Sequence, residues 1–116
     1  MGRPAVVQDD VWPRPSLRKR WFKNTIVCED EGWSLTYSGS TWRIDRYDYR
    51  ENGRLMTFGG EGASKQMDIF LTPDLSWEDA PTQSIDEETR RVILRRITAA
   101  LQWAGFSVGF FELIEE

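Results

Sequence analysis

The sequence predicts an α+β fold, in which an antiparallel β-sheet of about five or six strands packs against one C-terminal amphipathic α-helix. Short segments between residues 25 and 71 alternate apolar and polar side chains, which is typical of half-buried strands. A segment after residue 84 instead repeats its apolar side chains at helical spacing, which is typical of an amphipathic helix. The length of 116 residues suits one domain with its own core.

Residues 1–23 differ in composition from the rest of the chain. They contain Pro4, Pro13 and Pro15 and show no sustained periodicity, so we expect an irregular N-terminal arm. Six basic and two acidic residues give this arm a charge of +4, whereas nine basic and seventeen acidic residues give residues 24–116 a charge of −8. The sequence therefore predicts a basic Pro-containing arm, residues 1–23, followed by one acidic α+β domain, residues 24–116.

The first strands are predicted from the alternation of side chains. A short strand is expected at residues 25–29, and a polar turn follows at residues 29–32. Trp33, Leu35 and Tyr37 then alternate with polar residues, so these three side chains should face the core. A further turn is expected at residues 38–40.

A hairpin is predicted at Asn52-Gly53, because this pair favours the type I′ turn, in which both residues have positive φ. The predicted cross-strand pairs are Glu51 with Arg54, Arg50 with Leu55, Tyr49 with Met56, and Tyr47 with Phe58. This register places four large apolar side chains on one face, as a hairpin over a core requires. Upstream, Trp42 and Ile44 are out of phase with the two tyrosines. Either both faces of the strand are partly covered, or a β-bulge near Asp45-Arg46 restores the phase.

The glycine-rich segment at residues 59–65 is predicted to be a flexible loop, because glycine weakens a strand interior. Its sequence, GGEGASK, lacks the spacing of a phosphate-binding P-loop and joins two strands. A further strand is expected to follow, with Met67, Ile69 and Leu71 on one side. Residues 72–83 then form an irregular connection.

The C-terminal helix has recognisable ends in the sequence. Ser84 and Glu87 match a capping box, in which each side chain accepts a hydrogen bond from the other residue's backbone N–H. Gly105 is placed to end the helix, and the 20 residues from 85 to 104 span about 30 Å, enough to cover a sheet. The predicted sheet-facing residues are Ile93, Ile97, Ala100, Leu101 and Ala104, and the predicted solvent-facing residues are Arg91, Arg95 and Gln102. A last strand should run from about Phe106 to Leu113.

The residue inventory disfavours catalysis. The chain has no histidine and one cysteine, Cys28, so it lacks the commonest general base and zinc ligand and cannot form an intrachain disulfide. Cys28 lies in an apolar alternation and should be buried and unreactive. We therefore expect no enzyme activity, no cofactor and no metal site. The absence of a long apolar segment or a signal-peptide pattern predicts a cytoplasmic protein without a membrane anchor.

The best candidates for binding a partner are acidic and aromatic residues in the predicted loops. The segment DLSWED carries Asp74, Trp77, Glu78 and Asp79, and Glu61 lies in the glycine-rich segment. Two interpretations of DLSWED stay open. It forms either a solvated loop with Trp77 in the core, or an exposed acidic surface with an aromatic anchor for an Arg- or Lys-lined partner. The spacing of its acids is not that of an EF-hand calcium loop.

Three segments resemble small immunity proteins of bacterial polymorphic-toxin systems, whose toxins are contact-dependent or type VI secreted. They are YRENGRLMTFGGEG, MDIFLTPDLSWED and SIDEETRRVILRRITAALQWAG, which lie between residues 47 and 105. The Gly53-Arg54 hairpin and the acidic WED loop carry most of the likeness. The resemblance implies a non-enzymatic protein that binds one cognate toxin and blocks its active site or locks it.

The leading functional hypothesis is therefore an immunity protein that neutralises a cognate toxin by stoichiometric binding. Many toxins of this kind have a basic active-site cleft, toward which an acidic domain would be steered, whereas the same acidity disfavours nucleic acid as a partner. The predicted partner-binding residues are Glu61, Asp74, Trp77, Glu78 and Asp79. A homodimer stays open.

Two other functions compete with this hypothesis. A nucleic-acid-binding or regulatory accessory protein would act through the basic arm, where residues 18–23 interleave basic and aromatic side chains. A metal-dependent enzyme would instead use carboxylates, with Asp68, Asp74, Glu78 and Asp79 as its ligands.

Overall fold

The computed structural model describes residues 2–4, 17–20, 24–40 and 43–113. These residues form one eight-stranded sheet and one helix, so the α+β class is confirmed, but the sheet has more strands than the five or six predicted. The elements are β1 (Gly2–Pro4), β2 (Leu17–Arg20), β3 (Thr25–Cys28), β4 (Trp33–Ser40), β5 (Arg43–Glu51), β6 (Arg54–Ala63), β7 (Gln66–Leu71), α1 (Glu87–Trp103) and β8 (Ser107–Leu113). The two additional strands, β1 and β2, have three and four residues and are too short to show a period in the sequence. The predicted boundary at residue 23 lies outside the described residues.

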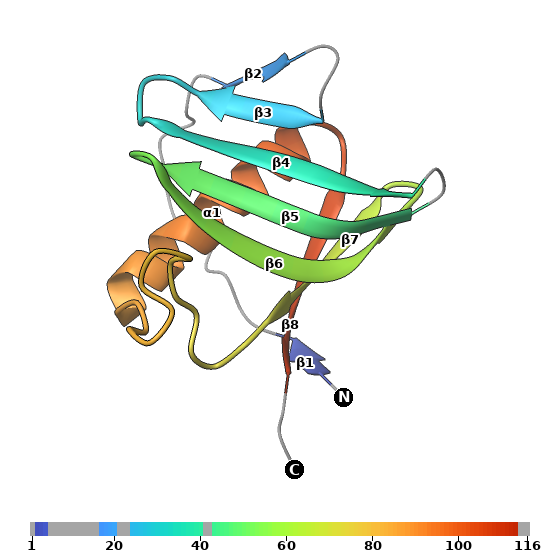
Figure 1. The fold of residues 1–116 in the computed structure, drawn as a ribbon. Coiled ribbons are helices and arrows are strands. Elements are labelled where there is room, and N and C mark those ends of the chain that lie inside the picture. Colours follow the sequence, from blue (N-terminus) through green and yellow to red (C-terminus); the bar gives the residue numbers. More distant parts are fainter. Residues whose placement is uncertain (1, 5–16, 21–23, 41–42, 114–116) are drawn as a thin grey trace.

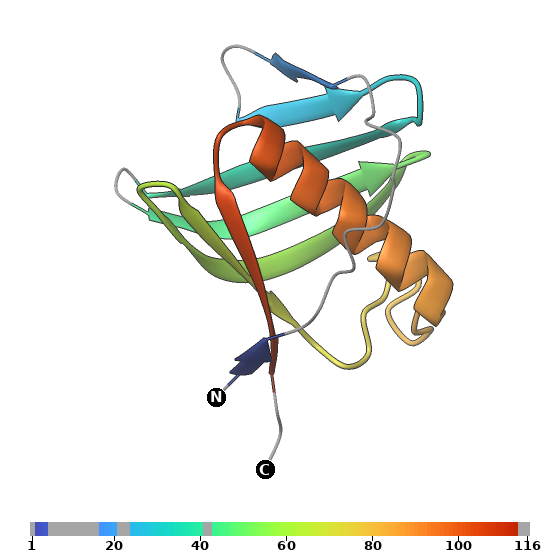
Figure 2. The same cartoon turned by 180° about the vertical axis from the view of Figure 1, so that it is seen from behind.

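The strand order in the sheet is β1-β8-β7-β6-β5-β4-β3-β2. Neighbouring strands are antiparallel except β7 and β8, which are parallel, so the predicted antiparallel pattern is wrong at this one pair. The cause is the connection through α1. A helix between two strands carries the chain back along the sheet, so the next strand enters in the same direction. Figures 1 and 2 show α1 lying across one face of the curved sheet.

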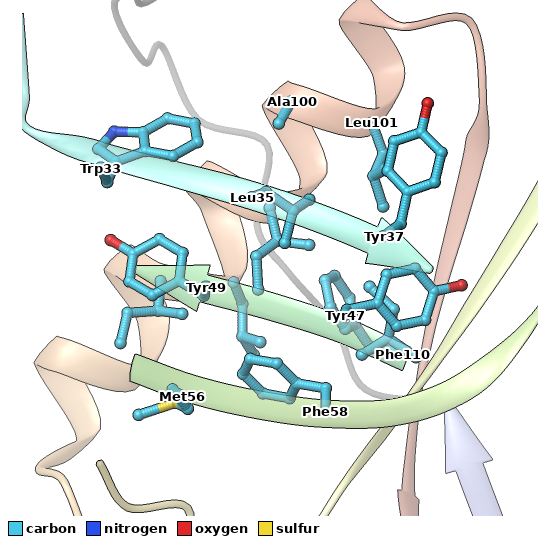
Figure 3. Packing of buried hydrophobic residues seen from close by; sticks show 14 of the residues in the cluster. Trp33, Leu35, Tyr37, Tyr47, Tyr49, Met56, Phe58, Ala100, Leu101 and Phe110 are labelled. Carbon is cyan, nitrogen blue, oxygen red and sulfur yellow. The ribbon is translucent and has the colours of Figure 1, made fainter. Parts of the chain in front are cut away.

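The core lies between α1 and this inner face of the sheet. Trp33, Leu35 and Tyr37 are at most 5% exposed, as predicted. Figure 3 shows Trp33 beside the ring of Tyr49 and Tyr37 beside Tyr47. The helix contributes its predicted residues Ile93, Ile97, Ala100 and Leu101, together with Leu94. Cys28 is fully buried, as predicted, and burial raises the pKa of its thiol.

The hairpin between β5 and β6 confirms the predicted register at all four pairs. Asn52 and Gly53 have φ values of 51° and 77°, as the predicted type I′ turn requires. The register of β5 against β6 shifts between Ile44 and Arg46. The predicted β-bulge is therefore present in this strand, whereas Trp42 lies outside the described residues.

The predicted glycine loop at residues 59–65 is wrong. Strand β6 continues to Ala63, and the turn is confined to Ser64 and Lys65, where Ser64 has a φ of 57°. Gly60 and Gly62 are needed for close packing rather than for flexibility. A Cβ on Gly62 would lie 3.1 Å from the Tyr47 hydroxyl and 2.9 Å from the Ile44 Cβ. Similarly, the turn predicted at residues 38–40 lies within β4, which runs to Ser40.

The helix begins two residues later than predicted. Its N-cap is Asp86, whose carboxylate accepts a 2.7 Å hydrogen bond from the Thr89 N–H, so the predicted Ser84 capping box is wrong. Gly105 ends the helix as predicted, with a φ of 98°. Arg95 was predicted to face solvent but is only 9% exposed, because the aliphatic stem of an arginine can cover apolar surface.

The outer face of the sheet, opposite α1, carries polar side chains on β5 and β6, among them Arg46, Asp48 and Thr57. In Figure 1 this face is toward the viewer, and none of the described elements lies over it. No helix within the described residues is long and apolar enough to cross a membrane.

Candidate partner-binding surface

The connection between β7 and α1 is irregular, as predicted, but it is held firmly to the rest of the fold. Leu75 and Trp77 are buried, at 6% and 7% exposed. The Glu78 N–H donates to the Leu55 carbonyl at 2.8 Å, and the Ile85 N–H donates to the Leu75 carbonyl at 2.8 Å. Figures 1 and 2 show this segment beside the first turn of α1.

The sequence of this region is strongly acidic. Residues 72–88 contain six acidic residues and no basic residue. We call the part of the surface formed by residues 72–88 the acidic end of the molecule. Its carboxylates can accept hydrogen bonds from cationic side chains of a partner, which are stronger than those between neutral groups.

Trp77 belongs to the core of the protein. Its ring lies 6.1 Å from the ring of Tyr49, and the Arg54 guanidinium lies over it at 4.8 Å. Of the two interpretations of DLSWED, the structure therefore agrees with the one that places this tryptophan inside. Trp77 anchors the connection and offers little of its own surface to a partner.

Asp79 and Arg54 form a two-pronged ion pair at the start of β6. The Arg54 Nη2 donates to Asp79 Oδ1 at 2.9 Å, and its Nε donates to Oδ2 at 3.1 Å. These hydrogen bonds hold the pKa of Asp79 below its ordinary value. The sequence did not indicate Arg54 as Asp79's partner, because the two residues lie 25 positions apart.

Glu78 joins a row of polar side chains on the outer face of the sheet. Its carboxylate accepts a 3.1 Å hydrogen bond from the Thr57 hydroxyl, which also lies 3.0 Å from the carboxylate of Asp48. Asp48 is only 8% exposed and accepts a further 2.9 Å hydrogen bond from Arg46, which raises the pKa of Arg46. Asp48 was missed by sequence reasoning, although its outward phase between Tyr47 and Tyr49 could have indicated it.

The remaining predicted residues lie apart from one another. Asp74 is exposed in the connection. Glu61 is also exposed, but it lies on β6 seven residues beyond Arg54, which is about 23 Å along a strand. It forms a 2.8 Å ion pair with Arg43. The structure therefore brings Asp74, Trp77, Glu78 and Asp79 into one region and leaves Glu61 outside it.

Sequence reasoning missed a second polar cluster, which is centred on the guanidinium of Arg96 in α1. The Arg96 guanidinium donates to the Tyr49 hydroxyl at 2.9 Å and to Glu51 at 2.8 Å. Glu31 accepts a 2.8 Å hydrogen bond from the Trp33 indole N–H. Burial raises the pKa of Tyr49, and so does its 2.6 Å hydrogen bond to Glu51. This cluster ties α1 to β4 and β5.

The two competing hypotheses gain no specific support from the geometry. In the described part of the basic segment, Arg18 hydrogen-bonds to Glu29 of the β3–β4 turn, which partly neutralises its charge. Among the described residues, no group of three or more His, Cys, Asp or Glu side chains could hold a metal ion. No family model, curated protein or solved structure matches this chain.

Proposed function

We propose that the protein is an immunity protein, which binds a cognate bacterial toxin and neutralises it by stoichiometric protein–protein interaction. The observation that supports this proposal best is the acidic end. It gathers six acidic residues and no basic one within residues 72–88, which comprise the connection and the start of α1, and buried Leu75 and Trp77 hold the connection in place. A fixed acidic surface suits a partner with a basic active-site cleft.

The expected mode of action is occlusion of that cleft. Opposite charges on the two proteins accelerate their encounter, and this acceleration falls as salt is added. Of the predicted contact residues, Asp74 and Glu78 are exposed carboxylates at the acidic end, whereas Trp77 supports the surface from beneath. Glu61 would contact a toxin only if the interface also extended over the far end of β6.

Co-expression with a candidate toxin gene tests the proposal, and the first candidates are the genes adjacent to the one for this protein. Cells that carry both should survive, whereas cells with the toxin and an empty vector should die. Equal death in the two cultures would falsify the proposed function. A stable one-to-one complex in gel filtration should accompany survival.

A charge-reversal pair locates the surface. Asp74→Lys with Glu78→Lys should abolish protection and slow association with the toxin. Asp30→Lys with Asp45→Lys makes the same change in net charge at exposed positions outside residues 72–88, so this control should retain most of the protection. Equal loss in both variants would show that only the overall charge matters.

A further inference from the structure

Cationic and aromatic side chains form one continuous chain of contacts from α1 to the acidic end. The Arg96 guanidinium lies 5.9 Å from the ring of Trp33, and this ring stacks on Tyr49 at 6.1 Å with an interplanar angle of 29°. Tyr49 contacts Trp77 at 6.1 Å, and Arg54 covers Trp77 at 4.8 Å. The five residues come from α1, β4, β5, the connection and β6. Figure 3 shows the Trp33 and Tyr49 rings side by side within it.

Carboxylates hold both ends of this series of side-chain contacts in place. At the helix end, Arg96 is held by the hydrogen bond to Glu51. At the other end, the face of the Arg54 guanidinium lies over the ring of Trp77, and its N–H groups donate hydrogen bonds to the carboxylate of Asp79. A planar guanidinium suits this double use, because it can stack and form two parallel hydrogen bonds at once. Asp79 is therefore tied to the core through Arg54 and Trp77.

We infer that Arg54 and Asp79 are positioning residues, which hold the connection in its binding conformation so that Asp74 and Glu78 can contact the partner. This inference rests on the proposed function for the identity of the partner. The Asp79 carboxylate is already engaged by Arg54, so it contributes order more than a direct contact. A loop that is ordered before binding loses less conformational entropy in the complex, which strengthens binding mainly by slowing dissociation.

The order of the connection can be measured without any partner. The amide N–H groups of Glu78 and Ala80 donate to the carbonyls of Leu55 and Trp77, at 2.8 Å and 3.0 Å, so their hydrogen exchange reports opening of this segment. Asp79→Asn should accelerate exchange at both amides by about 2- to 5-fold, the range expected for an exposed ion pair. Amides in the middle of β4 should not change.

Asp74→Asn is the matched control, because it removes one negative charge from the same exposed connection without touching Arg54. It should leave exchange at Glu78 and Ala80 unchanged. Arg54→Lys keeps the positive charge but loses the two-pronged geometry, so it should accelerate exchange as Asp79→Asn does. This variant also decides the matter if Asp79→Asn fails to fold. Unchanged exchange in both positioning variants would overturn the inference.

Binding to the cognate toxin then separates the two kinds of residue. Asp79→Asn and Arg54→Lys should raise the dissociation rate by a similar 2- to 5-fold factor. Asp74→Asn should instead slow association and weaken its salt dependence. If exchange responds as predicted but no toxin binds, the proposed function fails and the positioning role stands. If a toxin binds but exchange and dissociation do not respond, the positioning role fails alone.

Discussion

At the residue scale, Gly60 determines how closely β6 approaches β7. A Cβ at this position would overlap the Asp68 carbonyl oxygen and lie 2.7 Å from Tyr47 Cε2. Gly60→Ala should therefore destabilise the protein by about 2 kcal/mol or more, as overpacking of a core does. Gly59→Ala is the control, because a Cβ there would meet nothing within 4 Å. Urea unfolding of the two variants checks the difference, and equal stabilities would contradict the packing argument.

Arg96 is the residue whose removal should most disturb the polar cluster that ties α1 to β4 and β5. Arg96→Met keeps much of the side-chain volume but leaves Tyr49 and Glu51 without their shared donor. We expect a loss on the order of 2 kcal/mol in the free energy of unfolding. The control is Arg91→Met on the same helix, because Arg91 and its partner Glu88 are both exposed, and this change should stay within about 0.5 kcal/mol.

At the scale of the element, two substitutions distinguish between Asp86 and Ser84 as the N-cap of α1. The structure uses Asp86, whereas the sequence pattern indicated Ser84. Asp86→Ala should lower the melting temperature, and Ser84→Ala should leave it unchanged. The reverse result would restore the predicted capping box.

The same cap should make stability depend on acidic pH. The hydrogen bond from Thr89 lowers the pKa of Asp86 below its ordinary value of 3.8. For a lowered pKa, the stabilisation is fully present above that ordinary value and is lost as pH falls through the lower value in the folded state. The stability difference between the wild type and Asp86→Asn should therefore be constant near neutrality and shrink below pH 3.8. A difference that grows on acidification would contradict this assignment.

Elements with a local cause were predictable from the sequence, and those with a distant cause were not. Asn52 and Gly53 alone dictate their turn, so the register of β5 and β6 followed directly. Gly60 and Gly62 of β6 are required in part by the side chain of Tyr47, more than ten positions earlier in the chain. The two edge strands have three and four residues and are defined by their partners rather than by any period.

The candidate partner-binding surface also has features with a local cause, which the sequence shows, and features with a distant cause, which it does not. The acidity of residues 72–88 is visible in the sequence, because it needs only a count of charges. For Trp77 the sequence left a core and a surface position open, and the structure places its ring in the core beside Tyr49. The role of Asp79 was not visible in the sequence, because it is set by Arg54 on β6. The prediction of a loop at residues 59–65 groups Glu61 with Trp77 and Asp79, but the continuous strand β6 carries Glu61 away from residues 72–88.

At the scale of the whole molecule, one core joins the sheet to the helix. Buried residues from β3 to β8, from the connection and from α1 belong to a single hydrophobic cluster. Helix and sheet should therefore unfold together in one cooperative transition. Far-UV circular dichroism and tryptophan fluorescence should give the same midpoint in urea.

Ile97→Ala tests this cooperativity at the centre of the helix. Ile97 is fully buried against the sheet, so truncation should cost about 3 kcal/mol and shift both transitions by the same amount. Gln102→Ala, on the exposed side of α1, is the control and should shift neither by more than about 0.5 kcal/mol. If Ile97→Ala lowered the midpoint seen by circular dichroism but not the one seen by fluorescence, the helix would unfold separately. The acidic end, which lies at the start of α1, would then lack the rigid support that the proposed mode of binding requires.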